Sequence, residues 1–257
     1  MALVIEQFPC RSDNFGVLIH DPLSGLTAAI DAPEEEAIIQ KLQEKNWKLD
    51  HIFVTHHHRD HVEGNLPLKE ALGPTITGPA AEANKIPGID KQVKGGDRIM
   101  FGDYAINVID TPGHTLGHIS YYIPAAGLAF VADTLFAVGC GRVIEGTMDM
   151  MWESLGKLAT LPADTIVYCG HEYTETNIRF ALTIDSGNPA LVARAAEVKT
   201  LRGQGKATLP TTIAREKLTN PFLRVNEPDI RARLGMAAST PASEVFAEIR
   251  RRKDAFK

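Results

Sequence analysis

A cluster of metal-binding residue types occupies residues 55–61, where four histidines and one aspartate fall within seven positions. The cluster directly follows the apolar run 52–54, which is typical of a buried strand. Imidazole and carboxylate groups bind zinc and other first-row divalent ions in their deprotonated forms, so crowding them together requires a cation. A surface cluster or an expression tag is the alternative, but a tag lies at a terminus and does not follow a buried strand. The cluster therefore predicts a metal site.

Strand geometry distinguishes the histidines of this cluster from one another. If the chain is still extended after residue 54, alternation places His56 and His58 on one side and His57 on the other. His57 is then the histidine least suited to bind metal, and we expect it to support the others or to pack.

The end of the cluster has two interpretations. Asp60 and His61 are adjacent, so they would diverge in an extended segment and suit a second metal ion or a turn. Asp60 could alternatively cap a helix, because Glu63 lies three residues later at the spacing of a capping box. The two interpretations are compatible, since a cap also holds a carboxylate in place.

Three later apolar runs also end in residues that can bind metal. Strands that lie side by side in this way bring their carboxyl ends to one edge of a sheet, so we expect these residues to meet there. Of the nine histidines, only His20 and His51 lie outside the four strand ends. The runs and the residues that follow them are 105–109 with Asp110 and His114, 128–132 with Asp133, and 165–169 with His171.

The pool of candidate ligands is too large for one tetrahedral ion and suits two ions that share a carboxylate. Two such ions, about 3.5–4 Å apart, lower the pKa of a bridging water to about 7. The predicted chemistry is hydrolysis of an ester, thioester, amide or phosphodiester. Taken singly, His171 would be a structural histidine and Asp133 a turn residue; their shared position at strand ends favours the metal site. The pool is His56, His58, Asp60, His61, His114, Asp133 and His171, with His118 and Asp110 in reserve.

Composition limits the partners. With 257 residues the chain forms one large domain or two modest ones, and its net charge of −5 gives no electrostatic basis for binding nucleic acid or an anionic membrane. The most apolar stretch, 127–139, is short and contains Asp133, so no segment is expected to cross a membrane. The first residues do not resemble a signal peptide, and the three cysteines form no C-x-x-C motif. We expect a cytoplasmic monomer with reduced thiols.

Local patterns predict two domains. Residues 3–31 are typical of short strands in a meander, and helices are expected at 32–46 and 65–73. From residue 174 onward helical patterns dominate, including one that begins at Thr240 as cap with Pro241 in its first turn. We therefore place a boundary near residue 170, between a catalytic domain at 1–170 and a helical domain at 171–257. The later helices are expected at 174–184, 190–201, 212–218, 228–234 and 241–256.

The same motifs resemble a known superfamily. The string T-H-H-H-R-D-H resembles the H-x-H-x-D-H signature of the metallo-β-lactamases, and T-P-G-H-T-L-G-H, A-D-T and C-G-H-E-Y resemble its later motifs. Nearly end to end, the chain is similar to glyoxalase II, the hydroxyacylglutathione hydrolases. The more specific motifs are G-C-G-R-V-I-E-G-T at 139–147, G-H-E-Y-T at 170–174, N-P-F-L-R at 220–224 and R-R-K-D at 251–254.

The resemblance implies an α+β fold, a four-layer αβ/βα sandwich followed by a small helical domain that completes the substrate site. It also implies two divalent ions, zinc first with iron or manganese as alternatives, that hold a hydroxide. This hydroxide would cleave the thioester of S-D-lactoylglutathione to D-lactate and glutathione, as in methylglyoxal detoxification. Asp133 would bridge the ions and Asp60 would orient the hydroxide. The implied ligands are His56, His58 and His114 for one ion, and Asp60, His61 and His171 for the other.

Glutathione binding in this family uses basic and aromatic groups that match Arg142, Tyr173, Arg250 and Lys253. The last two lie three apart on a helix and could hold one carboxylate between them, or could merely complement the helix C-terminus. Arg142 replaces the family's lysine and Ile144 replaces a tyrosine, so the second change removes a hydroxyl.

Three other functions compete with this one. A persulfide dioxygenase of the same superfamily uses one iron and does not need the second-site histidines, so His61, His171 and the C-terminal helices argue against it. A β-lactamase has no use for the helical domain. A non-catalytic binding module would be expected to have lost ligands, and here the ligand set is complete.

Overall fold

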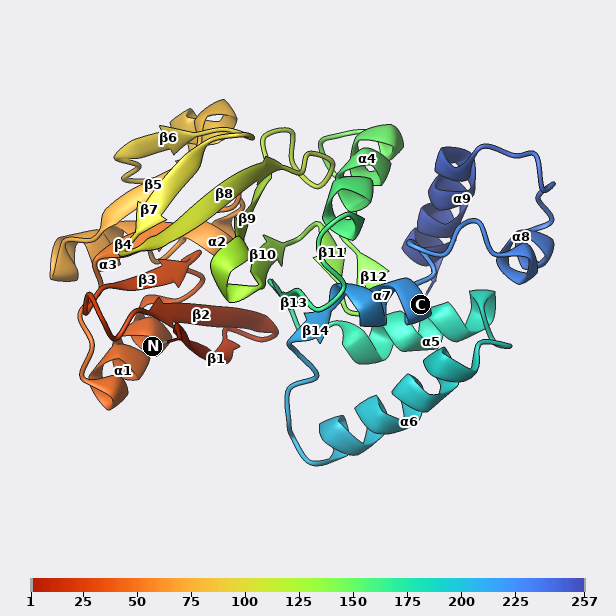
Figure 1. Cartoon of the computed structure of the whole chain (residues 1–257), viewed down its shortest axis with the longest axis horizontal. Coiled ribbons are helices and arrows are strands. Elements are labelled where there is room, and N and C mark those ends of the chain that lie inside the picture. Colours follow the sequence, from red (N-terminus) through yellow and green to blue (C-terminus); the bar gives the residue numbers. More distant parts are fainter. Residues whose placement is uncertain (1, 257) are drawn as a thin grey trace. The chain divides into compact units, whose positions relative to one another are not determined.

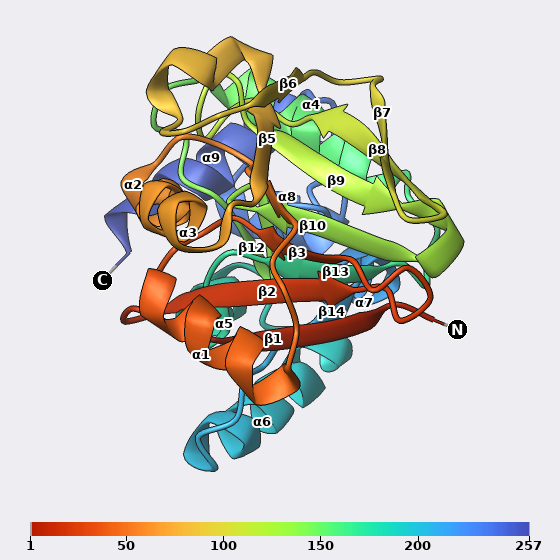
Figure 2. The same cartoon turned by 90° about the vertical axis from the view of Figure 1, so that its left-hand side faces the viewer.

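The structure is a computed structural model that describes residues 2–256, and its chain forms two compact units. Unit 1 comprises Met1–Asp110 and Thr115–Val131, and unit 2 comprises Thr111–His114 and Ala132–Lys257. Figures 1 and 2 show the ribbon of the chain from two directions.

The first sheet of unit 1 has six strands in the order of the sequence. Its first three strands pair antiparallel and its last four pair parallel. Parallel neighbours need a crossover, and two helices supply it, α1 (Glu35–Lys45) between β3 and β4 and α3 (Asn65–Leu72) between β4 and β5. The strands are β1 (Val4–Cys10), β2 (Asn14–His20), β3 (Thr27–Ile30), β4 (His51–Phe53), β5 (Thr75–Pro79) and β6 (Lys91–Val93).

Helices α1 and α3 cover this sheet because each turns an apolar stripe toward it. Ile38 and Leu42 of α1 and Leu68 of α3 are buried in one cluster with Ile52 and Ile76 of the central strands. The C-cap residues of α1 and α3 are Asn46 and Gly73, and both adopt the left-handed conformation that closes a helix. The short helix α2 (Arg59–Val62) follows β4 after a loop, and η1 (Ala80–Lys85) follows β5 directly.

A second, antiparallel sheet in unit 1 runs in the order β10-β9-β8-β7. It packs on the first sheet through aromatic rings, since the Phe53 ring lies 5.7 Å from Tyr121 and 6.2 Å from Phe101 between centroids. The buried Tyr121 hydroxyl donates to the Val54 carbonyl at 2.7 Å. The strands are β7 (Arg98–Phe101), β8 (Tyr104–Asp110), β9 (Ile119–Ile123) and β10 (Leu128–Ala132), with η2 (Pro124–Ala126) after β9.

The four ligand-bearing strands do not lie side by side in one sheet as predicted. β4 belongs to the first sheet, whereas β8 and β10 belong to the second with β9 between them. β8 and β10 are both antiparallel to β9, so their carboxyl ends lie beside its start. The carboxyl end of β4 is there too, because Thr55 O accepts from Ile119 N at 2.9 Å. Three strand ends of unit 1 therefore share one side, through two sheets.

Unit 2 is mainly helical. Its aromatic core joins α4, α9 and the turn after α7, with the Phe246 ring 5.8 Å from both Trp152 and Phe222 between centroids. Its elements are β11 (Leu135–Phe136) paired with β12 (Gly139–Cys140), α4 (Met148–Ala159), β13 (Ile166–Cys169) paired with β14 (Thr211–Thr212), α5 (Thr174–Ile184), α6 (Pro189–Gly203), α7 (Ile213–Thr219), α8 (Pro228–Leu234) and α9 (Ala242–Ala255).

The helices expected after residue 174 are present, with differences at their ends. α5 and α8 have the predicted bounds, whereas α9 begins at Ala242 with Pro241 as its N-cap, one residue later than predicted. α4 was not predicted, although Thr147 caps it by accepting from Met150 N and its buried face repeats at helical spacing. No helix in residues 2–256 has the length and apolarity needed to cross a membrane.

Candidate metal centre

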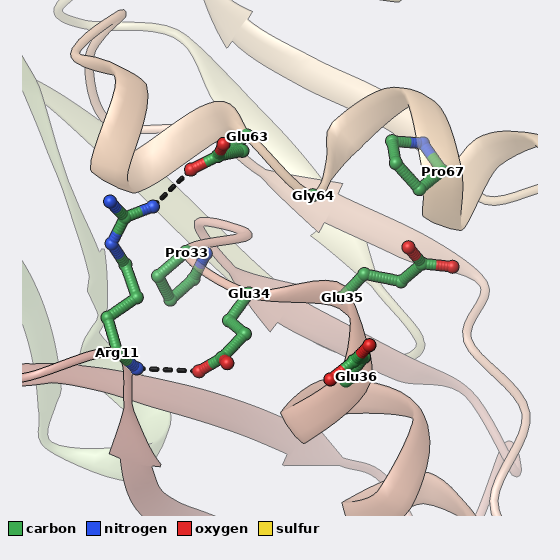
Figure 3. Close-up of a pocket in the computed structure, with 8 residues that line it drawn as sticks. All are labelled: Arg11, Pro33, Glu34, Glu35, Glu36, Glu63, Gly64 and Pro67. Atoms are coloured by element: carbon green, nitrogen blue, oxygen red, sulfur yellow. Dashed lines mark hydrogen bonds and ion pairs between the residues drawn. The ribbon is translucent and has the colours of Figure 1, made fainter.

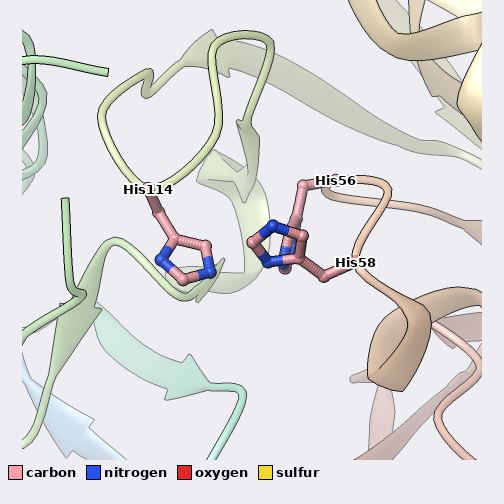
Figure 4. Close-up of side chains that lie close together, drawn as sticks. All are labelled: His56, His58 and His114. Carbon is pink, nitrogen blue, oxygen red and sulfur yellow. The ribbon is translucent and has the colours of Figure 1, made fainter. Parts of the chain in front are cut away.

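Unit 1 supplies the histidine cluster predicted from the sequence. His56 and His58 lie on the loop after β4, and the centroids of their rings are 4.9 Å apart (Figure 4). His61 follows in α2, and its ring centroid lies 4.2 Å from that of His56. His56 and His61 are buried, and His58 is half-buried. The crowding of three imidazoles in a buried loop is the arrangement expected of metal ligands.

Asp31 organises this cluster through three hydrogen bonds. Its Oδ1 accepts from Thr55 N at 2.7 Å, and its Oδ2 accepts from Thr55 Oγ1 at 2.8 Å and from His61 Nδ1 at 2.8 Å. Because the Thr55 hydroxyl donates its hydrogen bond to Asp31, the Thr55 oxygen accepts a hydrogen bond from His56 Nδ1 at 3.0 Å. Both imidazoles then carry their proton on Nδ1, so Nε2 is the nitrogen whose lone pair suits a metal.

Asp60 is held by an asparagine from the first hairpin. Asn14 Nδ2 donates to Asp60 O at 3.1 Å and to Asp60 Oδ2 at 3.2 Å. Asp60 Oδ2 lies 3.6 Å from His61 Nε2, so the carboxylate and imidazole converge. The capping-box interpretation of Asp60 is wrong, because the N-cap of α2 is His58 and Asp60 lies within the first turn.

His57 and His118 lie beside the candidate ligands. The ring of His57 turns to Glu82, with Nδ1 at 2.7 Å from Oε2. The ring of His118 is buried and stacks on His56 with centroids 4.8 Å apart. Asp110, the other reserve residue, is exposed and accepts from Gly95 N at 2.6 Å through Oδ1.

Unit 2 contains a second group of candidate ligands, centred on Asp133. Its Oδ2 lies 3.3 Å from His114 Nε2 and 3.4 Å from His171 Nε2, and all three residues are buried. His114, drawn in Figure 4 on the loop after β8, donates from Nδ1 to Arg142 O at 2.8 Å. The ring of His171 stacks on Tyr173 at 4.7 Å between centroids. One carboxylate thus faces two imidazole nitrogens, which suits a ligand shared by two cations.

The donors present in both units fit divalent metal ions. Asp31, His56 and His61 each offer an atom within 4.8 Å of the others, and every such group within residues 2–256 consists of histidine with carboxylate or histidine alone. In His56, His61 and His114, Nδ1 is already engaged, so each ring is oriented by a neighbouring acceptor before any ion arrives.

The predicted glutathione-binding residues differ in exposure. Arg142 is exposed and Tyr173 is 37% exposed, whereas Arg250 is only 3% exposed. The Arg250 guanidinium donates to Cys140 O and to Asp254 Oδ1, both at 2.9 Å. Lys253 Nζ donates to Thr176 O at 3.3 Å, and burial, followed by the nearby Arg250 and Arg179 charges, lowers the pKa of its ammonium to about 8.

An acidic pocket in unit 1 is separate from the histidine cluster. It surrounds the start of α1, and no histidine lines it (Figure 3). Arg11 N donates to Glu34 Oε2 at 2.6 Å, and the Arg11 guanidinium forms an ion pair with Glu63. Two of its carboxylates therefore already bind Arg11, and the pocket lacks the histidines of the candidate centre.

Three supporting residues were missed by the sequence analysis, namely Asp31, Asn14 and Glu82. Asp31 follows the strand β3 and so shares the pattern used to find the other candidates, an apolar run that ends in a carboxylate. Asn14 and Glu82 carry no comparable pattern, because each acts on a segment 25 or more residues away.

Comparisons with known proteins identify the family of the chain. The family model for the metallo-beta-lactamase superfamily matches residues 11–171, and the model for the hydroxyacylglutathione hydrolase C-terminus matches residues 172–256. A relative from Brucella ovis, described as hydroxyacylglutathione hydrolase, is 61% identical over 99% of this chain and 98% of its own length.

Solved structures show the same fold. ETHE1 from Myxococcus xanthus has a TM-score of 0.67 at 26% identity and covers 99% of this chain and 100% of its own. The BLEG-1 B3 metallo-beta-lactamase has a TM-score of 0.67 at 20% identity and covers 86% of this chain and 99% of its own. The predicted fold class, an α+β metallo-β-lactamase fold followed by a helical C-terminal region, is confirmed. The chain therefore belongs to the hydroxyacylglutathione hydrolase family, within the metallo-β-lactamase superfamily.

Proposed function

We propose that this protein hydrolyses the thioester of S-D-lactoylglutathione and related 2-hydroxyacylglutathiones, with two divalent metal ions at the centre described above. The observation that carries the proposal is the pairing of a full-length 61% identity to a hydroxyacylglutathione hydrolase with a hydrogen-bond network that engages Nδ1 of His56, His61 and His114, so that Nε2 is the ring nitrogen suited to bind metal.

The ligands divide into two sets in this proposal. His56, His58 and His114 would hold one ion, and Asp60, His61 and His171 would hold the other. Asp133 belongs to both sets, which its position between two imidazoles in unit 2 supports. When bound, a pair of ions supplies a hydroxide nucleophile near neutral pH and a Lewis acid for the carbonyl oxygen.

The protein's own residues would then orient the nucleophile. Asp60, which Asn14 holds at two points, would accept a hydrogen bond from the nucleophile and so direct its lone pair to the thioester carbon. Addition of hydroxide to the thioester carbon and cleavage of the C–S bond give the 2-hydroxy acid and the glutathione thiolate, and a proton then passes from the acid to the thiolate. A thiolate leaves readily at neutral pH, so the site needs no strong general acid.

Cationic and aromatic residues of unit 2 bind the glutathione moiety. Arg142 and Tyr173 offer exposed groups, and Lys253 offers an ammonium whose partial burial strengthens an ion pair with a peptide carboxylate. Arg250, buried against Cys140 O and Asp254, supports this region with its charge.

Further parts of the proposal follow from the family and the donor chemistry. Zinc is the first candidate metal, with iron or manganese as alternatives, because histidine and carboxylate ligands suit all three. The protein acts as a cytoplasmic monomer in methylglyoxal detoxification. The catalytic domain comprises residues 1–170 and the helical domain residues 171–257.

A direct assay tests the function. Purified metal-replete protein is expected to consume S-D-lactoylglutathione, which is monitored by the loss of thioester absorbance. Elemental analysis is expected to find two metal ions per chain. His58→Ala and Asp133→Ala are expected to reduce turnover to near background, whereas Asp103→Ala, at an exposed turn residue, serves as the matched control. No turnover by the metal-replete protein would refute the proposal. One iron per chain with oxygen uptake on glutathione persulfide would identify a persulfide dioxygenase instead.

A further inference from the structure

Glu82 forms a buried link between two loops of unit 1 that are distant in sequence. It lies in η1 just after β5 and is only 2% exposed. Its Oε2 accepts from His57 N at 2.8 Å and from His57 Nδ1 at 2.7 Å, and its Oε1 accepts from Gly117 N at 2.8 Å. Both carboxylate oxygens are thus used, and two of these donors are backbone amides.

These two amides lie next to candidate metal ligands. His57 N belongs to the residue between His56 and His58, so fixing this amide restrains the backbone on both sides of it. Gly117 precedes His118, whose ring stacks on His56, and follows His114 by three positions. One carboxylate therefore restrains two histidine-bearing loops, 25 and 35 residues away from it in the sequence.

The close approach of these loops depends on Gly117. A Cβ atom at this position would lie 2.6 Å from Glu82 Cγ and 2.8 Å from Ala81 Cβ, so a side chain there would push the carboxylate away. The donors also keep the carboxylate charged. Burial alone would raise the pKa of Glu82, but hydrogen bonds to its oxygens and the neighbouring His57 outweigh burial and hold the pKa below its ordinary value.

We propose that Glu82 is a positioning residue whose carboxylate fixes the 56–58 and 117–118 segments and thereby preorganises the histidines that bind metal. The inference rests on the metal-ligand assignment in the proposed function. Charge-assisted hydrogen bonds are the strong ones, and supporting residues of this kind typically change metal affinity or activity by about 10- to 100-fold. Preorganised ligands lose less freedom when the ion binds, so the metal is released more slowly.

The test compares metal release from wild type, Glu82→Gln and Glu82→Asp. Glutamine keeps the shape but places an amide N–H against one of the N–H donors, so Glu82→Gln is expected to release metal to a chelator about 10- to 100-fold faster. Glu82→Asp keeps the charge and is expected to restore part of the difference.

Asp21→Asn is the matched control for a general loss of stability. Asp21 is a second buried carboxylate of unit 1, and it accepts from Leu23 N at 3.0 Å and Ser24 N at 3.3 Å in the turn after β2. This variant is expected to lower the unfolding temperature of the metal-free protein without changing the rate of metal release. Equal release rates in Glu82→Gln and wild type, or equal acceleration in Asp21→Asn, would overturn the inference.

Amide hydrogen exchange in the metal-free wild type gives a second test that does not require a variant to fold. The amides of His57 and Gly117 are expected to exchange slowly, and unprotected amides at both positions would overturn the inference. A wild type that binds no metal would instead refute the proposed function, so the two failures are distinguishable.

Discussion

Asp31 accepts a 2.8 Å hydrogen bond at Oδ2 from Nδ1 of His61, thirty residues away in the sequence. The same oxygen accepts from the Thr55 hydroxyl, whose oxygen in turn accepts from His56 Nδ1. One carboxylate therefore sets the tautomers of two candidate ligands, one directly and one through a hydroxyl group.

Asp31→Ala is expected to lower metal affinity and turnover by about 10- to 100-fold, because both imidazoles lose the acceptors that orient them. Competition with a chelator measures the affinity, and thioester hydrolysis measures the turnover. Unchanged affinity in a folded variant would show that the His61 ring is held by other contacts.

Gly141→Ala is expected to abolish most of the activity. A Cβ atom at Gly141 would lie 1.8 Å from the backbone oxygen of Asp133, so the peptide that carries the proposed shared ligand must move. Displacement by about 1 Å can cost about 100-fold in rate. Gly156→Ala is the control, because no atom lies within 4 Å of a Cβ there, and alanine is the better helix former in α4. Steady-state kinetics of both variants test the prediction; full activity in Gly141→Ala would contradict it.

Lys253 is expected to make substrate binding depend on pH. Because its pKa is lowered to about 8, the ammonium is charged below this pH and loses its charge as the pH rises through it. The KM for the glutathione thioester is therefore expected to rise between pH 7 and pH 9 in the wild type, and to be high and less dependent on pH in Lys253→Met.

The control for Lys253 is Arg251→Gln, which removes an exposed charge from the same helix, α9, and is expected to leave the KM unchanged. A wild-type KM that stays constant across this pH range would show that Lys253 does not contact the substrate as a cation.

Arg194 and Glu216 form a buried ion pair at 2.7 Å, and their side chains are 2% and 0% exposed. Arg194→Met leaves the Glu216 charge buried without its cation and is expected to reduce the free energy of unfolding by about 3–5 kcal/mol. Arg194→Met combined with Glu216→Gln is expected to be less destabilised than the sum of the two single variants, because they share one interaction. Urea unfolding of the four proteins measures this coupling; strict additivity would mean that the pair contributes nothing.

Local patterns in the sequence predicted the elements whose ends are fixed by nearby residues. The bounds of α5 and α8 agree with the predicted ranges, and α3 lies within the predicted range 65–73, with Gly73 as its C-cap. β5 and α4 were not predicted, although α4 begins with an N-cap threonine and carries buried residues at helical spacing. Strand periodicity does not specify partners, so the separation of β4 from β8 and β10 into two sheets was also missed.

The sequence by itself determined the residue types of the candidate ligands, the placement of each at the end of an apolar run, and the family, because metal chemistry depends on residue identity and local spacing. Only the tertiary structure decided what orients those ligands. Asp31, Asn14 and Glu82 act on segments 24 to 46 residues away, and the Arg250 guanidinium is buried against Cys140 O, 110 residues earlier. Such hydrogen bonds join atoms that packing brings together, and no periodic pattern in the chain encodes them.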